Sequence, residues 1–110
     1  MTESLMETNA LGCTPDSRAV ATRLAALSHP ARIEILKYLS ASNSCYCREV
    51  VDRFDLAQST VSQHLKILVD AGLVRFEPDR QRSRYAIDRA ALADVSASVA
   101  ALVNSCCSGR

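Results

Sequence analysis

The 110-residue sequence lacks most of the local patterns that enzymes use. Its three glycines, Gly12, Gly72 and Gly109, are isolated, so no glycine-rich loop is available to hold a phosphate group. No catalytic triad is recognisable, and there is no Cys-x-x-Cys motif, no βαβ pattern and no cysteine close in sequence to a histidine. Because a thiol oxidoreductase would be expected to show such features, we predict that the protein is not an enzyme.

Signals for export and for membrane insertion are also missing from the sequence. It has no secretory h-region and no apolar run near 18 residues, so we expect a cytoplasmic protein that does not enter a membrane. The sequence contains five cysteines. Without a signal peptide, they favour metal or redox chemistry over structural disulfides.

Charge is nearly balanced but unevenly distributed. The formal net charge is +1, with three acidic and no basic residues in 1–16, and thirteen basic and nine acidic residues in the rest. We interpret residues 1–16 as a flexible tail and residues 17–110 as one domain of about +4. A modestly basic domain is compatible with DNA binding but does not by itself demand it.

The most informative stretch is QSTVSQHLKILVDAG, residues 58–72. Its apolar residues Val61, Leu65 and Leu68 recur at the spacing of one helix face. The opposite face carries Gln, Ser, Thr and Lys side chains, which can reach base edges and phosphate oxygens. A short helix ending near Phe54 and a three-residue turn precede it, so the two helices are expected to form a helix-turn-helix.

Further elements are expected on both sides of this motif. Two earlier helices cover residues 17–27 and 30–39, and in the second we expect a buried stripe of Ile33, Leu36 and Leu39 with Arg32 and Lys37 exposed. Residues 73–77 and 83–87 are expected to be strands joined by an arginine-rich loop, 78–82, which is typical of a wing lying along DNA.

A last helix is expected over residues 89–104. Leu92, Val95, Val99 and Leu102 recur on one face of it, which suits packing against a partner helix. The predicted fold is therefore mainly α with a small β-hairpin: a winged helix-turn-helix that forms a homodimer through its first and last helices.

In four segments the chain resembles the ArsR/SmtB family of winged-helix, metal-responsive repressors: LAALSHPARIEILKYL (24–39), CYC (45–47), STVSQHLKILVDAGLV (59–74) and RQRSRYAI (80–87). The resemblance implies a homodimer that binds double-stranded operator DNA and is released when a metal or metalloid binds. The DNA contacts it implies are Gln58, Ser59, Thr60, Ser62, Gln63, His64 and Lys66 on the helix, and Arg82 and Arg84 on the wing.

The cysteines extend the resemblance without completing it. Cys45 and Cys47 stand where related arsenic, antimony, cadmium and lead sensors carry a Cys-x-Cys box, but the position of a third in-helix cysteine is Val50. The second pair, Cys106 and Cys107, resembles that of another arsenic-sensor variant, but the third cysteine of that variant is absent here as well. The predicted metal ligands are therefore Cys45, Cys47, Cys106 and Cys107. Either the two pairs cooperate, or Cys13 of the tail completes one of them, within or across the dimer.

Thiolates favour soft ions and must lose their protons to bind them. The expected inducer is trivalent arsenic or antimony, with Cd(II) or Pb(II) as further candidates and no constitutive cofactor. The alternative is a repressor of the same fold that responds to an oxidant or to sulfide through disulfide or polysulfide bridges. The family's His/carboxylate zinc site is not expected, because the last helix has no histidine and, after Asp88, only Asp94 as an acid.

Overall fold

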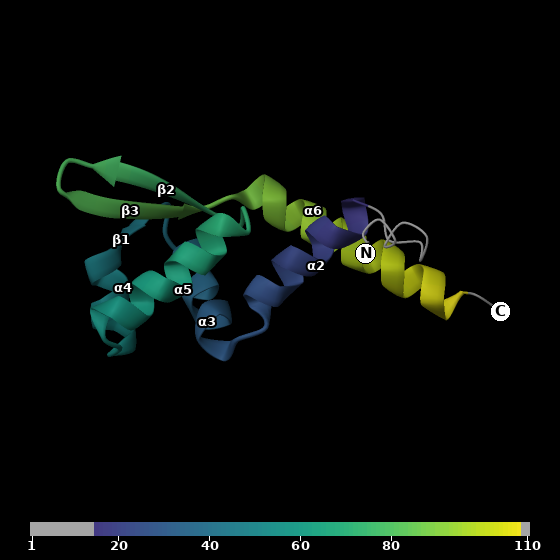
Figure 1. Ribbon diagram of the computed structural model, residues 1–110, viewed down its shortest axis with the longest axis horizontal. Helices are drawn as coiled ribbons and strands as arrows, with labels where there is room; N and C mark the ends of the chain where they lie inside the picture. Colours follow the sequence, from purple (N-terminus) through teal and green to yellow (C-terminus); the bar gives the residue numbers. More distant parts are fainter. Residues whose placement is uncertain (1–14, 109–110) are drawn as a thin grey trace, which may run out of the picture.

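A computed structural model of the chain describes residues 15–108. The elements in chain order are α2 (Pro15–Leu27), α3 (Pro30–Ser40), β1 (Cys45–Tyr46), α4 (Cys47–Phe54), α5 (Gln58–Asp70), β2 (Val74–Asp79), β3 (Arg82–Ile87) and α6 (Arg89–Cys107). The sheet lies over α3, α4 and α5 at one end of the molecule, while α2 and α6 extend toward the other end (Figure 1). The predicted fold class, a mainly α winged helix-turn-helix, is confirmed, and the homodimer stays a prediction. The predicted tail lies almost wholly outside the described residues, as does Cys13.

The wing is a three-stranded antiparallel sheet in the order β1-β3-β2 rather than a plain hairpin. The short strand β1 pairs Cys45 with Tyr85 and Tyr46 with Arg84, which joins the cysteine segment to the wing. In the hairpin itself Asp79 pairs with Arg82, so the connecting turn is shorter than the predicted loop 78–82. Residue Arg80 takes a positive φ of 60° in that turn.

Helix α5 ends at a glycine with φ +82°. The amide of Gly72 donates to Val69 O (2.9 Å) and the amide of Leu73 donates to Leu68 O (3.0 Å). This is the Schellman arrangement, in which a left-handed residue satisfies the last carbonyls of a helix. The helix therefore stops at Gly72, and the chain passes directly into the wing.

The core fills the space between α3, α4, α5 and the sheet. Its fully buried large side chains are Ile35, Leu39, Leu65, Leu68, Leu73, Val50 and Val61. Each such side chain stabilises the fold by about 1.5–3 kcal/mol relative to leaving it exposed. The whole predicted stripe of α5, which is Val61, Leu65 and Leu68, is thus buried in the core. The opposite face of α5 is left to solvent.

The predicted inner face of α3 was partly wrong. Ile33 is 42% exposed, whereas Ile35 is fully buried together with Leu39. Arg32, expected in solvent, is half-buried, and its Nε donates to Ala26 O at 2.7 Å. The reason is that successive helix residues are about 100° apart, so Arg32 falls on the same side of α3 as Ile35 and Leu39.

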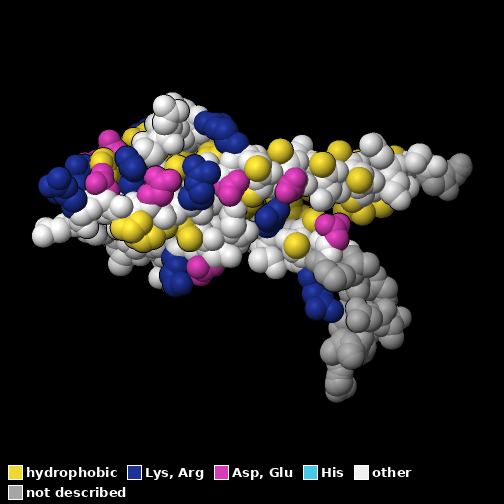
Figure 2. Space-filling view, turned by 90° about the horizontal axis from the view of Figure 1, so that it is seen from above, with side chains coloured by type: hydrophobic (Ala, Val, Ile, Leu, Met, Phe, Trp, Pro, Cys, Tyr) yellow, Lys and Arg dark blue, Asp and Glu magenta, His cyan; other side chains and the backbone are white. Residues whose placement is uncertain are grey.

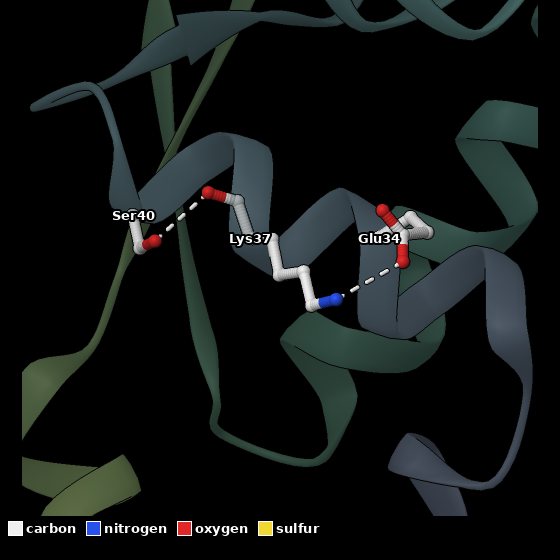
Figure 3. A network of polar contacts seen from close by, with 3 residues as sticks. All are labelled: Glu34, Lys37 and Ser40. Carbon is white, nitrogen blue, oxygen red and sulfur yellow. Dashed lines mark hydrogen bonds and ion pairs between the residues drawn. The ribbon is translucent and has the colours of Figure 1, made fainter.

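The solvent face of α3 carries a short polar network, drawn in Figure 3. Lys37 Nζ lies 3.2 Å from Glu34 Oε2, and Ser40 Oγ donates to Lys37 O at 2.8 Å. An exposed pair of this spacing is worth only about 0.2–0.5 kcal/mol. The network therefore marks the outside of α3, as predicted for Lys37, and leaves the opposite side to the core.

Helix α6 projects beyond the rest of the molecule, with hydrophobic side chains along its exposed surface (Figure 2). Leu102 and Val103 are 56% and 49% exposed. By length and composition alone, α6 is the one helix of residues 15–108 that could cross a membrane. An exposed apolar helix face is typical of an interaction surface, because water disfavours contact with apolar side chains.

Candidate nucleic-acid interface and cysteine pairs

The exposed side of α5 carries most of the side chains predicted to contact DNA. Gln58, Ser59, Thr60, Gln63 and Lys66 are exposed, and Ser62 is half-buried. Lys66 forms an exposed ion pair with Asp70, Nζ to Oδ2 3.0 Å. The first turns of α5 therefore present hydrogen-bonding groups without a carboxylate, and the acid is confined to the end of the helix.

The start of α5 is open. Its N-cap residue, Ala57, has no side chain that accepts a hydrogen bond, so the first amides of the helix lack a side-chain partner at that position. Free amides and the positive end of a helix dipole favour an anion such as a phosphate.

The position of His64 argues against its predicted role as a DNA contact. Its side chain is only 8% exposed and lies on the core side of α5, with the His29 ring at 4.6 Å between centroids. Arg32 Nη1 lies 3.3 Å from His64 Nδ1. Because a guanidinium only donates, that nitrogen must accept, which requires the neutral imidazole. Burial, then His29 and Arg32, lower the pKa of His64. In the sequence, residues 61, 64, 65 and 68 have the spacing of one helix face, so His64 falls on the apolar stripe of α5.

The two predicted wing contacts are held in different ways. Arg82 is exposed and its guanidinium carbon lies 3.6 Å from the centre of the Tyr46 ring. Arg84 is half-buried, and its Nη2 lies 3.4 Å from Glu77 Oε1. The buried Nε of Arg84 has no hydrogen-bond acceptor among residues 15–108. Arg82 therefore has more of its guanidinium available for phosphate than Arg84.

A groove of about 660 Å³ separates the wing from the helix-turn-helix. Its walls come from the start of α4, the start of α5 and the wing, and they include Cys47, Arg48, Gln58, Ser62, Arg82 and Tyr85. The groove thus brings predicted DNA contacts from α5 and from the wing together with one thiol.

Cys45 and Cys47 have different surroundings. Cys45 belongs to β1 and is 3% exposed. It faces Tyr38 of α3, whose pKa is raised first by burial and then by the neighbouring Cys45. Cys47 is the first residue of α4 and half-buried, and its Sγ lies 3.7 Å from Ser62 Oγ. The strand that buries Cys45 was not predicted from the sequence.

The second cysteine pair lies elsewhere. Cys106 and Cys107 are exposed thiols at the far end of α6, whereas β1 and α4 lie at the opposite end of the molecule (Figure 1). Within one chain the four predicted ligands therefore do not converge. Among residues 15–108, no three His, Cys, Asp or Glu side chains are grouped so that they could hold a metal ion.

The chain is similar to known regulatory proteins. Residues 29–75 match the family described as bacterial regulatory protein, arsR family. The arsenical resistance operon repressor of Staphylococcus aureus is 36% identical over 78 residues, which cover 71% of this chain and 74% of that protein. The HTH-type transcriptional regulator YgaV of Escherichia coli is 39% identical over 87 residues, covering 79% and 85%.

Solved structures agree on the fold. An ArsR-like transcriptional regulator from Rhodococcus sp. RHA1 matches with a TM-score of 0.73 and 24% identity, over 81% of this chain and 83% of that one. Together, the matches in sequence and fold point to regulation of transcription rather than to catalysis. The chain belongs to the bacterial arsR family of DNA-binding transcriptional regulators.

Proposed function

We propose that the chain is a cytoplasmic repressor that binds operator DNA as a homodimer and leaves it when thiolates capture trivalent arsenic or antimony. The name of the Staphylococcus aureus relative, an arsenical resistance operon repressor, supports this inducer class. The contact that carries the proposal is the one between Cys47 Sγ and Ser62 Oγ, 3.7 Å apart. A ligand held by Cys47 would act directly on the helix that is proposed to contact bases. Cd(II) and Pb(II) are weaker candidates with the same soft-ligand preference.

The proposed DNA contacts are the exposed or half-exposed members of the predicted set, namely Gln58, Ser59, Thr60, Ser62, Gln63, Lys66, Arg82 and Arg84. The helix places its side chains in the major groove, and the wing arginines contact the backbone. A second copy packed on the apolar face of α6 would supply the other α5, so that two half-sites about one helical turn apart are contacted together. The exposed Leu102 and Val103 support that interface.

The thiols fit a soft ion by their chemistry, but residues 15–108 supply only two of them near α5. Cys45 and Cys47 are the proposed core of the inducer site, and a three-coordinate ion needs one more ligand. Cys13 is the candidate for it, from the same or the partner subunit. Cys106 and Cys107 lie too far along α6 to join them within one chain (Figure 1), so they are a separate pair in this proposal.

Capture of an ion by Cys45 would change the wing as well as α5. The Cys45 side chain is buried, and its backbone pairs with Tyr85 of β3. A thiolate drawn toward an ion shared with Cys47 has to leave that buried position, which disturbs the β1–β3 pairing. The inducer can lower the DNA affinity only as far as it binds the DNA-releasing conformation more tightly than the DNA-binding conformation. A typical coupling free energy of about 1–3 kcal/mol corresponds to a change of about 5- to 150-fold in DNA affinity.

A repressor that responds to an oxidant or to sulfide is the second candidate. The observation that favours it is the pairing of the thiols, because a disulfide needs two sulfurs whereas a trigonal metalloid site needs three. Oxidation of Cys45 and Cys47 would form one S–S bond and transfer two protons and two electrons to a peroxide, whose O–O bond breaks to give two waters, or an alcohol and water. The adjacent Cys106 and Cys107 suit this less within one helix, because neighbouring Cα atoms are about 3.8 Å apart, shorter than the usual disulfide span.

The test is release of labelled operator DNA by arsenite or antimonite, measured by fluorescence anisotropy without oxygen. The double variant Cys45→Ser/Cys47→Ser should bind DNA normally and no longer release it. Its matched control, Cys106→Ser/Cys107→Ser, should release like the unmodified protein. Normal release by both double variants would show that neither pair is required and would refute the metalloid site. Release by a peroxide but not by a metalloid would establish the redox candidate instead.

A further inference from the structure

The residue between the two cysteines makes two contacts with the wing. The Tyr46 ring lies under the guanidinium of Arg82, 3.6 Å from ring centre to Cζ. The Tyr46 hydroxyl donates to Asp79 Oδ2 at 2.6 Å. Tyr46 therefore touches both of the oppositely charged residues that flank the hairpin turn.

We propose that Tyr46 is a positioning residue for DNA binding, which presents Arg82 to the phosphate backbone and keeps Asp79 from neutralising it. This inference rests on the proposed contact between Arg82 and the DNA phosphate backbone, and it adds the residue that positions Arg82 for that contact.

The hairpin register shows why such a residue is needed. Asp79 and Arg82 are directly paired across β2 and β3, and opposite charges at paired positions attract each other. Among the ion pairs of residues 15–108, none joins Asp79 to Arg82. The Asp79 carboxylate instead accepts from Tyr46. An Arg82 paired with Asp79 would offer a phosphate fewer free N–H groups and a weaker charge.

Stacking on the ring leaves Arg82 usable. A guanidinium over an aromatic face is attracted by the ring while its N–H groups, which lie in its plane, remain free to donate. The stack also restricts a long side chain before DNA arrives, so that less freedom is lost on binding.

Tyr46 is itself fixed at its backbone. Its amide donates to Glu49 Oε1 at 2.7 Å at the start of α4. In the sheet it pairs with Arg84 of β3. The backbone of Tyr46 is therefore fixed by contacts with α4 and β3. Because neither contact involves the hairpin turn, the position of the ring under Arg82 does not depend on that turn.

The first test is Tyr46→Leu, assayed for operator affinity over a range of salt concentrations. Loss of an exposed cation–π contact should weaken DNA binding about 2- to 5-fold. The salt slope should fall by about 1, because one phosphate contact is lost. Phe76→Leu is the matched control: it removes an aromatic ring from the same sheet, one that packs on Tyr85, and it should leave the slope unchanged.

The decisive variant is Tyr46→Leu/Asp79→Asn. If Tyr46 acts by holding Asp79 away from Arg82, removing the charge of residue 79 should restore most of the salt slope. A purely structural role for Tyr46 predicts no such rescue, and an unrescued slope would overturn the inference. If Tyr46→Leu does not fold, Tyr46→Phe, which keeps the ring and loses the donor, should show a smaller loss that Asp79→Asn also rescues.

Arg82→Ala separates this inference from the proposed function. If Arg82→Ala leaves the salt slope unchanged, the proposed contact between the wing and the DNA phosphate backbone is refuted. If Arg82→Ala lowers the slope and Tyr46→Leu does not, the contact stands and only the role of Tyr46 is refuted.

Discussion

Acidification should destabilise the fold through His64, the buried histidine of α5. Its ring is held between His29 and Arg32, and burial lowers its pKa. The unfolded chain binds a proton near the ordinary histidine pKa of about 6.5, whereas the folded protein does so only at lower pH. Well above pH 6.5, His64 is neutral in both states, so its titration does not change the free energy of unfolding. Below it, that free energy falls by up to about 1.4 kcal/mol per pH unit until the folded pKa is passed.

The measurement is urea unfolding between about pH 8 and about pH 5 at one fixed protein concentration, because a dimer's stability depends on concentration. His64→Gln removes the titrating group, so the difference between unmodified protein and variant isolates its contribution. His29→Asn is the control, since asparagine still accepts the helix-capping bond from Ala31 N that His29 Nδ1 now accepts. It should retain most of the pH dependence, because burial is the largest cause of the shift. Equal pH dependence in His64→Gln and unmodified protein would refute the buried, neutral state.

Three further outcomes follow from the same structure. Gln63→Ala should relax operator specificity by about 1–3 kcal/mol at one base pair, and an unchanged preference across operator variants would remove Gln63 from the contact set. Leu102→Asp should give monomers in sedimentation and weaker DNA binding, since it places a charge in the proposed seam. Asn104→Asp, about 200° away around α6, should remain dimeric. Gly72→Ala should cost about 1–2 kcal/mol in thermal unfolding because of its positive φ. A Cβ there would meet only Arg23 Nη2 at 3.7 Å, so an unchanged stability would contradict the strain argument.

The sequence predicted the elements whose signals are local. The predicted helix-turn-helix was confirmed, with α4 ending at Phe54 and α5 beginning at Gln58. The last helix likewise begins at a local signal, since Asp88 Oδ1 accepts from Ala91 N at 3.0 Å. These features could be inferred because a helix start, a helix stop and an apolar stripe depend on residues within one or two turns of each other.

Contacts between segments could not be inferred in this way. The two-residue strand β1 exists only because β3 offers it a partner, so Cys45 became a buried strand residue rather than part of a helix. Likewise, the Arg32 side chain of α3 is half-buried because its guanidinium has hydrogen-bond acceptors in two other helices. These acceptors are Ala26 O of α2 and His64 Nδ1 of α5. Neither partner is near Arg32 on the same helix.

The sequence by itself determined the order of the elements, the polar face of α5 and the presence of two thiol pairs, because periodicity and residue type are local properties. Only the tertiary structure decided which of these residues meet. It turned His64 inward, separated Cys45 and Cys47 from Cys106 and Cys107 by the length of the molecule, and placed Tyr46 against Asp79 and Arg82. Those outcomes depend on how helices and strands pack across long stretches of chain, and that packing is fixed by the shape of the whole core.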